Sequence, residues 1–170
     1  IGRMVDEFSS FARMPAPSMR NQDIVDICRQ SLFLQRSANS DVEYSFDGPS
    51  TPLILRCDGR QLSQVLTNLL QNAHDAIEGR FEAAKARSED ESTQDKGRIS
   101  LSIQAEDGHV RIAIQDNGKG LPTEQRERLT EPYVTTRKKG TGLGLAIVKK
   151  IMEDHGGSLI LDDAPEQGAL

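Results

Sequence analysis

The stretch that decides the fold runs from Asp58 to Ile77 and reads DGRQLSQVLTNLLQNAHDAI. Asp58, with Gln61 three residues later, has the form of a capping box at the start of a helix. The apolar residues that follow share one helical face. They are Leu62, Val65, Leu66, Leu69, Leu70, Ala73, Ala76 and Ile77. The pattern predicts a long helix that begins after Asp58 and buries this face.

A polar stripe runs along the rim of the same helix. Asn68, Asn72 and Asp75 stand at positions i, i+4 and i+7. Asparagine is a poor helix former, so two of them on one stripe need an explanation. An amide oxygen can ligate Mg²⁺ beside phosphates without the repulsion that another carboxylate would bring. The stripe predicts a magnesium and phosphate site, with a solvated helix face as the alternative.

Extended and helical patterns flank the long helix. A helical pattern covers Ile24 to Leu34, and extended runs follow at Val42 to Phe46 and Leu53 to Cys57. Farther along, residues 99–103 and 110–114 alternate apolar and polar side chains around the turn Asp107-Gly108. This alternation predicts a β-hairpin.

The C-terminal third predicts a short helix near Glu124 to Leu129, a last helix from Leu143 to Glu153 and a strand at Ser158 to Leu161. His155-Gly156-Gly157 suits the end of the last helix, because glycine adopts the left-handed cap. Helices mixed with hairpin-connected strands predict an α+β fold of two layers rather than a doubly wound parallel sheet.

A second chemical cluster, Asp116-Asn-Gly118-Lys-Gly120, lies where the second strand of the hairpin ends. A carboxylate at a strand end can accept a hydrogen bond from an exocyclic amine such as that of adenine. The glycines would let the backbone approach a flat ring. A plain turn is the alternative.

A third cluster, Gly140-Thr141-Gly142-Leu143-Gly144-Leu145, opens the last helix after Arg137, Lys138 and Lys139. Unpaired backbone N–H groups and the helix dipole make such a start an anion site. The spacing fits neither the G-x-G-x-x-G dinucleotide fingerprint nor the Walker sequence. We therefore expect a different kind of nucleotide site.

The first residues form an amphipathic pattern. Residues Ile1, Met4, Val5, Phe8, Phe11 and Ala12 have helical spacing, and the pattern ends at Met14-Pro15. Because so short a helix is marginal alone, it needs a partner. The rest of a helical bundle, a second copy of the helix, and the chain's own globular domain are the candidates.

The composition excludes some classes of function. The 170 residues carry a formal net charge of −5, so no global basic field gathers nucleic acid or anionic membrane. Cys28 and Cys57 match neither a disulfide framework nor a zinc spacing, and we expect reduced thiols in packing roles. No apolar run approaches the ~20 residues that span a bilayer. Residues 88–96 are polar and predict a mobile insertion.

Taken together, the clusters resemble the N, G1, F and G2 boxes of histidine kinases, in the family's order. The F-box piece is Glu131-Pro-Tyr133-Val-Thr-Thr136. The resemblance covers roughly Asp23 to the C-terminus and implies a Bergerat ATP-binding fold, a two-layer α/β sandwich, for residues 23–170, after a linker at 14–22. Residues 5–17 resemble the end of the dimerisation helix in nitrogen-regulation sensors of the NtrB and NtrY type, NtrY more closely, which implies this role for residues 1–13.

The resemblance implies an ATP or ADP site with Mg²⁺. Its nucleotide-binding residues would be Asn68, Asn72, Asp75, Asp116, Gly118, Gly120, Tyr133, Thr136, Arg137, Lys138, Gly140, Thr141, Gly142, Leu143, Gly144 and Leu145. By the same resemblance, Asn72 would hold Mg²⁺ and Asp116 would bind the adenine amine. Asn68 and Arg137 would act in catalysis.

Residues 137–145 would then form the hinge of a lid over the triphosphate, anchored by Tyr133. At position 75, better-known relatives often carry a phosphate-binding lysine, whereas this chain has Asp75. The phosphate cation must therefore come from elsewhere, and Arg137 and Lys138 are the candidates.

The activity implied is phosphoryl transfer rather than hydrolysis. Gyrase-like and chaperone ATPases with this fold carry a glutamate as general base four residues before the metal asparagine, where this chain has Asn68. An amide cannot accept the proton. A nucleotide-responsive interaction module with degenerate catalysis and a scaffold without nucleotide are the alternatives.

None of the three histidines, His74, His109 and His155, has the context of a phosphoacceptor. The resemblance implies that the acceptor lies in the dimerisation bundle before Ile1, and that a response-regulator receiver domain takes the phosphoryl group onto an aspartate. It further implies a homodimeric parent anchored in the inner membrane, with this domain in the cytoplasm and no nucleic-acid partner.

Overall fold

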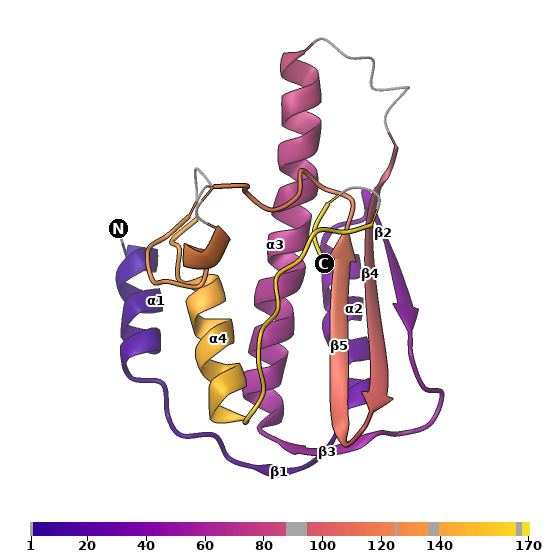
Figure 1. Cartoon of the computed structure of the whole chain (residues 1–170), viewed down its shortest axis with the longest axis vertical. Helices are drawn as coiled ribbons and strands as arrows, with labels where there is room; N and C mark the ends of the chain where they lie inside the picture. The colour runs from indigo at the N-terminus through magenta and orange to yellow at the C-terminus, as the bar shows by residue number, and fades with distance from the viewer. Residues whose placement is uncertain (1, 88–94, 125, 136–139, 166–167) are drawn as a thin grey trace.

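The structure is a computed structural model that describes residues 2–87, 95–124, 126–135, 140–165 and 168–170. Figure 1 shows the elements along the chain. In order they are α1 Gly2–Ala12, β1 Arg20–Asp23, α2 Ile24–Ala38, β2 Val42–Asp47, β3 Ile54–Cys57, α3 Gly59–Ala86, β4 Gly97–Glu106, β5 His109–Asp116, the single 3₁₀ turn η2 Arg126–Arg128, and α4 Gly144–Asp154.

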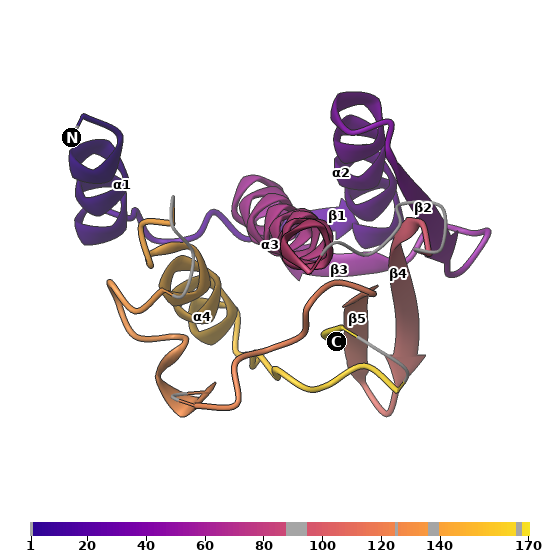
Figure 2. The same cartoon turned by 90° about the horizontal axis from the view of Figure 1, so that it is seen from above.

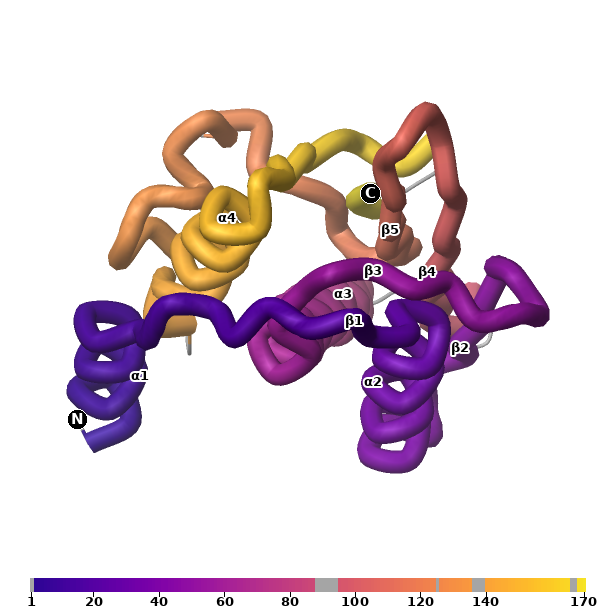
Figure 3. Tube along the Cα trace, turned by 90° about the horizontal axis from the view of Figure 1, so that it is seen from below, coloured from indigo at the N-terminus to yellow at the C-terminus, as the bar shows by residue number. Residues whose placement is uncertain are grey.

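The molecule has two layers. The main sheet has the strand order β2-β4-β5, with β2 parallel to β4 and β4 antiparallel to β5. Figure 2 shows α4, α3 and α2 in one layer beside the layer of the sheet. β1 and β3 form a separate antiparallel pair, which crosses the end of the molecule where α3 begins (Figure 3). A mixed sheet packed on helices confirms the predicted α+β class.

The hairpin follows its sequence pattern. Ile99, Leu101 and Ile103 of β4 are buried, and the polar residues between them are not. Asp107 and Gly108 at the turn have positive φ angles of 43° and 80°. This is the tight turn that matches the twist of two paired strands.

Only half of the predicted capping box forms at the start of α3. The Asp58 carboxylate accepts hydrogen bonds from Arg60 N and Gln61 N. The Gln61 side chain, however, donates to Pro15 O instead of returning to Asp58. The Asp58 N–H donates to His155 Nε2 at 3.0 Å, so the C-terminal end of α4 completes the cap.

The core lies between the helices and the sheet. Its fully buried large side chains are Ile24, Leu66, Leu70, Ile77, Ile99, Leu101, Leu143 and Ile151. Cys28 and Cys57 are buried and unpaired, as predicted. Burial, with a smaller contribution from Asp23, raises the pKa of the Cys28 thiol to about 12, so this group packs as an apolar side chain.

The prediction of a strand at Ser158 to Leu161 is wrong. These residues form no ladder with another described segment, and Ile160 is exposed. A short apolar run permits a strand, but a strand also needs a free neighbouring backbone. The chain instead turns back on itself, with an isolated bridge between Asp163 and Ala169.

Two other expectations at the N-terminal side need correction. Residues 20–22, predicted as the end of a linker, belong to β1, whose polar sequence has no apolar alternation because both faces are largely exposed. Leu34, the last apolar residue of the predicted helical pattern, lies within α2 but is 66% exposed.

Helix α1 forms as predicted, but only its C-terminal end reaches the core of the domain. Phe11 at this end and Met14 just beyond it contact the core, whereas Met4, Val5 and Phe8 are exposed. Within the described ranges, no helix combines the length and the apolar composition that crossing a membrane would require.

Candidate functional site

The two glycine-rich segments contact α3 on either side of Asn72. Asn68 Nδ2 donates to Gly144 O at 3.4 Å, and Lys119 N donates to Ala76 O at 3.0 Å. Because a helix rises about 1.5 Å per residue, Asn72 lies about 6 Å along the axis from each contact. Residues four apart share a helix face. The three predicted clusters therefore meet along one face of α3, between α4 and β5 (Figure 2).

The turn after β5 packs directly against the backbone of α3. A Cβ atom on Gly118 would lie 2.5 Å from the carbonyl carbon of Ala76, a distance that only glycine avoids. Gly120 has a φ of +82°, which favours glycine as well. The contact with α3 requires Gly118, a reason that the sequence alone did not reveal.

Asp116 is a buried acceptor at the end of β5. Its side chain is 6% exposed, and Oδ1 accepts hydrogen bonds from Gly118 N at 2.9 Å and Ala169 N at 3.3 Å. Burial raises the pKa of this carboxyl, although both N–H donors and the charge of Arg80 act in the opposite direction. No described residue donates to Oδ2. Asp116 can therefore accept a further hydrogen bond from a ligand.

The start of α4 also depends on glycine. Gly142 has a φ of +73°, and a Cβ atom there would lie 2.5 Å from the carbonyl carbon of Tyr133. Tyr133 N donates to Gly142 O at 3.0 Å, which holds the two segments together. No side-chain hydrogen bond from the described residues caps α4, so its first backbone N–H groups can receive an anion.

The residues of this segment face different neighbours. Leu143 is fully buried in the core, Leu145 is half-buried and Gly140 is half-buried. Thr141 Oγ1 donates to the Glu7 carboxylate of α1. The structure thus links the G-x-G-x-G segment to the N-terminal helix as well as to α3.

Tyr133, the predicted lid anchor, is exposed and has a φ of 68°. Its ring stacks on Phe8 of α1, with the centroids 6.1 Å apart and the planes at 30°. The ring therefore contacts α1. The predictions for Thr136, Arg137, Lys138 and Lys139 fall outside the described residues.

On α3 itself, Asn72 and Asp75 are half-buried. No described residue makes a hydrogen bond to the Asn72 side chain. The Asp75 carboxylate accepts a hydrogen bond from Gln71 Nε2 at 2.9 Å. The Asn72 side chain is thus available for a ligand.

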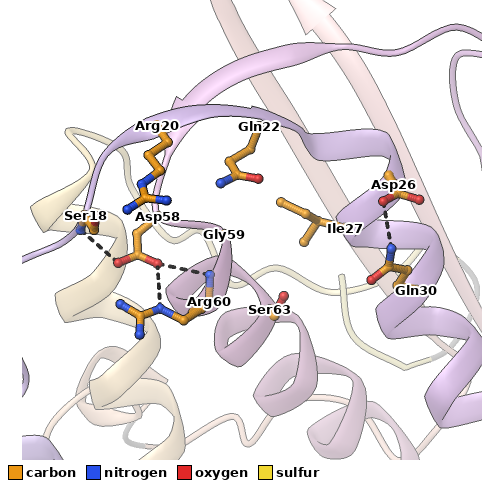
Figure 4. Close-up of a pocket in the computed structure, with 10 residues that line it drawn as sticks. All are labelled: Ser18, Arg20, Gln22, Asp26, Ile27, Gln30, Asp58, Gly59, Arg60 and Ser63. Atoms are coloured by element: carbon orange, nitrogen blue, oxygen red, sulfur yellow. Dashed lines mark hydrogen bonds and ion pairs between the residues drawn. The ribbon is translucent and has the colours of Figure 1, made fainter.

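Two cavities lie near α3, and neither is lined by Asn72 or Gly142. The larger, about 610 Å³, lies at the N-terminal end of α3, where Ser18 and Arg60 contact Asp58 (Figure 4). The smaller, about 420 Å³, reaches Asp116 from the end of the sheet. The predicted site is held together by contacts to α3, through the Asn68 side chain and the Ala76 carbonyl.

Two residues at this face were not predicted. Asn117 Oδ1 accepts from Arg98 N at 2.7 Å, and its Nδ2 donates to Lys96 O, so it closes the turn onto β4. Arg80 lies on α3 eight residues after Asn72. Its positive charge opposes the larger effect of burial, which raises the pKa of Asp116. The helical spacing from Asn72 was the signal that could have identified Arg80.

The family follows from comparison with known proteins. Residues 57–170, which include all three clusters, match the model of the Histidine kinase-, DNA gyrase B-, and HSP90-like ATPase family. The chain belongs to this family. The α3, Asp116 and α4 elements described above are thus the parts of this family's fold that the chain contains.

Among relatives in this ATPase family, the chain is 53% identical over 166 residues to the nitrogen regulation protein NtrY of Azorhizobium caulinodans, covering 98% of the chain and 20% of NtrY. It is 32% identical over 173 residues to the sensor histidine kinase ZraS of Klebsiella oxytoca, covering 100% of the chain and 34% of ZraS. The chain spans a fifth to a third of these curated relatives.

Solved structures share the family fold. Full-length ShkA in complex with AMPPNP has a TM-score of 0.76 and 30% identity, covering 98% of this chain and 34% of ShkA. The mycobacterial sensor histidine kinase MprB has a TM-score of 0.70 and 29% identity, covering 87% of this chain and 88% of the MprB chain.

Proposed function

We propose that the chain is the ATP-binding catalytic domain of a two-component sensor histidine kinase. It transfers the γ-phosphoryl group of ATP to a histidine outside this chain, from which a response-regulator aspartate receives it. The observation that carries the proposal is the position of Asn72 along α3, between the contact of Asn68 with the start of α4 and the contact of Ala76 with the turn after Asp116.

The donor set fits Mg-ATP. The Asn72 amide has no partner among the described residues and offers one neutral oxygen, which suits Mg²⁺ when phosphates and water supply its other ligands. Bound Mg²⁺ would supply charge neutralisation at the phosphates. Asp116 Oδ2 would accept the adenine amine, and the first N–H groups of α4 would bind phosphate oxygens. The complex of ShkA with AMPPNP supports a nucleotide in this site.

Asn68 favours transfer over hydrolysis. Its Nδ2 donates to Gly144 O, so the amide holds α3 against the start of α4. An amide is not a general base for water. The residue therefore supports a site that positions the γ-phosphoryl for an external nucleophile, with Arg137 or Lys138 as the cation.

The histidines of the chain support an acceptor elsewhere. His74 is 6% exposed on α3, and His155 is committed through both ring nitrogens to Asp58 N and Ile151 O. His109 starts β5 beside the hairpin turn, with Nδ1 near Asp107 O. An acceptor imidazole must instead approach the γ-phosphate in line.

We also propose the partners that this reaction needs. Residues 1–13 continue a dimerisation bundle that carries the acceptor, and a receiver domain docks on the assembled homodimer. The structure of the histidine kinase ThkA in complex with the response regulator protein TrrA has the same fold as this chain. Because ATP is cytoplasmic, the domain belongs on that side of a membrane-anchored parent.

Nucleotide binding is tested by thermal unfolding of the chain with Mg-ATP. At about 100 times the dissociation constant, binding should stabilise the fold by about 2.7 kcal/mol. Asn72→Ala and Asp116→Asn should remove most of this stabilisation. Gln64→Ala, an exposed amide of α3, and Asp47→Asn, an exposed carboxylate at the end of β2, should keep it.

Phosphoryl transfer is tested with radioactive ATP. The chain alone should remain unlabelled, and a separate polypeptide with the acceptor helices of an NtrY relative should become labelled when the chain is added. Self-labelling of this chain would contradict the proposal. Binding without transfer would favour an interaction module with degenerate catalysis, and absence of binding would favour a scaffold.

A further inference from the structure

His74 is a buried imidazole without a hydrogen-bond partner. The residue is 6% exposed, and neither Nδ1 nor Nε2 has a partner in the described part of the chain. A buried polar group left unsatisfied destabilises the folded state. Nothing in the proposed kinase chemistry uses this side chain.

Two carboxylates stand beside this imidazole. One nitrogen of His74 and one oxygen each of Asp75 and Glu78 all lie within 4.8 Å of one another. His74 and Glu78 are four residues apart on α3, and residues at this spacing are neighbours on a helix surface. Glu78 is exposed and Asp75 is half-buried, so the cluster opens from the buried imidazole toward solvent.

The cluster lies on a different side of α3 from the proposed nucleotide site. With about 100° per residue, His74 projects about 160° and Glu78 about 120° around the helix axis from Asn72. Asp75 lies between the two sides and is already turned toward Gln71 of its own helix. An ion held here would not replace the Mg²⁺ beside Asn72.

We propose that His74, Asp75 and Glu78 form a binding site for a divalent transition-metal ion such as Zn²⁺. Zn²⁺ takes imidazole nitrogen and carboxylate oxygen at about 2.0–2.2 Å, so its ligand atoms stand about 3.5 Å apart in a tetrahedron. The ligand atoms, which lie within 4.8 Å of one another, would have to approach to this value on binding the ion. The imidazole disfavours Mg²⁺ and Ca²⁺, which prefer oxygen ligands.

The ion would give the buried imidazole the partner that it lacks. It would also tie residues 74–78 of α3 into one turn, leaving water in the remaining coordination position. Metal binding would therefore stabilise the middle of the helix that carries Asn72. The inference does not rest on the proposed function, because two of the three ligands, His74 and Glu78, are not among the predicted nucleotide-binding residues, and only Asp75 is.

The test is titration of the untagged chain with Zn²⁺ and Co²⁺, without nucleotide and with excess Mg²⁺. We expect one ion per chain, visible absorption from four-coordinate Co²⁺, and a rise in Tm of about 5 °C at ~100 times the dissociation constant of Zn²⁺. His74→Leu should abolish the Co²⁺ absorption, and Glu78→Gln should weaken Zn²⁺ binding about tenfold or more.

The matched controls are Glu82→Gln, which removes a charge one turn farther along α3, and His109→Ala, which removes an exposed imidazole. Both should bind Zn²⁺ as the parent chain does. Unchanged Zn²⁺ binding in His74→Leu, or equal weakening in Glu78→Gln and Glu82→Gln, would overturn the proposal. Because Glu78 is exposed, its variant should fold even if His74→Leu does not. Mg-ATP binding is measured on Glu78→Gln as well. If this variant still binds Mg-ATP, its loss of Zn²⁺ binding is distinct from a failure of the nucleotide site.

Discussion

Asp58 and Asp116 are two buried aspartates at strand ends, 4% and 6% exposed, yet their pKa values shift in opposite directions. The Asp58 carboxylate accepts from Ser18 N, Arg60 N and Gln61 N through both oxygens. These bonds, led by that from Ser18, lower its pKa against the effect of burial. At Asp116, both donors reach the same oxygen, and burial raises the pKa.

This difference distinguishes an aspartate that stabilises the fold from one that is available to bind a ligand. Hydrogen bonds to both oxygens stabilise the charged form, and such a group has less capacity left for a ligand. An incompletely satisfied carboxylate keeps that capacity. Asp58 therefore belongs to the network that joins α3 to α4, and Asp116 belongs to the nucleotide face.

The largest effect that we expect is on the free energy of unfolding when Asp58 is replaced, and it tests the comparison of the two aspartates directly. Asp58→Ala removes the helix cap and leaves Ser18 N without its acceptor, so the free energy of unfolding should fall by about 3 kcal/mol. Urea unfolding measures this loss. Asp58→Asn, which keeps a capping side chain, should lose much less, and equal losses in the two variants would contradict the role of the cap.

The next effect concerns Asp116 and appears in binding rather than folding. Asp116→Asn should weaken Mg-ATP binding by about 2 kcal/mol, or about 30-fold, because a charged acceptor for the adenine amine is lost. Isothermal titration calorimetry gives the affinity, and urea unfolding should show little loss of stability. If Asp116→Asn lost as much unfolding free energy as Asp58→Ala, the assignment of Asp116 to ligand binding rather than to the fold would be contradicted.

A smaller effect is expected at His155. Because the Asp58 N–H can only donate, His155 Nε2 accepts and Nδ1 carries the proton toward Ile151 O. His155→Leu should cost about 1.5 kcal/mol of unfolding free energy, since the Asp58 N–H loses its acceptor. The measurement is urea unfolding, with His109→Leu as the exposed control. Mg-ATP affinity should change less than in Asp116→Asn.

The smallest effect lies in the pH dependence of unfolding. A lowered pKa in the folded state means that Asp58 contributes stability above its unfolded pKa, about 3.9, and loses it as pH falls through the folded value. The raised pKa of Asp116 acts oppositely, since its ionised form disfavours folding and acid relieves this. The measurement is the unfolding free energy from urea titrations between about pH 3 and pH 7. In Asp58→Asn this free energy should fall less toward acid pH than in the parent chain. The unfolding free energy of Asp116→Asn, compared with that of the parent chain, should instead increase toward neutral pH.

Much of the fold and site could be predicted because the signals are local. The apolar face of α3, the alternation of β4 and β5, the positive-φ turn at Asp107-Gly108 and the cap at Asp58 each depend on residues within a few positions of one another. The prediction of a strand at Ser158 to Leu161 was wrong because a short apolar run says nothing about whether a neighbouring strand is free. β1 was missed because a polar edge strand has no periodic signal.

By itself, the sequence determined that an amide-bearing helix, an acidic strand end and a glycine-rich helix start occur in the order of an ATP-binding kinase domain. Only the tertiary structure decided which donors reach each carboxylate, since Ser18 lies 40 residues from Asp58 and Ala169 lies 53 residues from Asp116. It also placed His155 on Asp58, 97 residues away, and left His74 buried beside two carboxylates. Hydrogen bonds and burial depend on atoms that meet only after folding, and no local pattern encodes them.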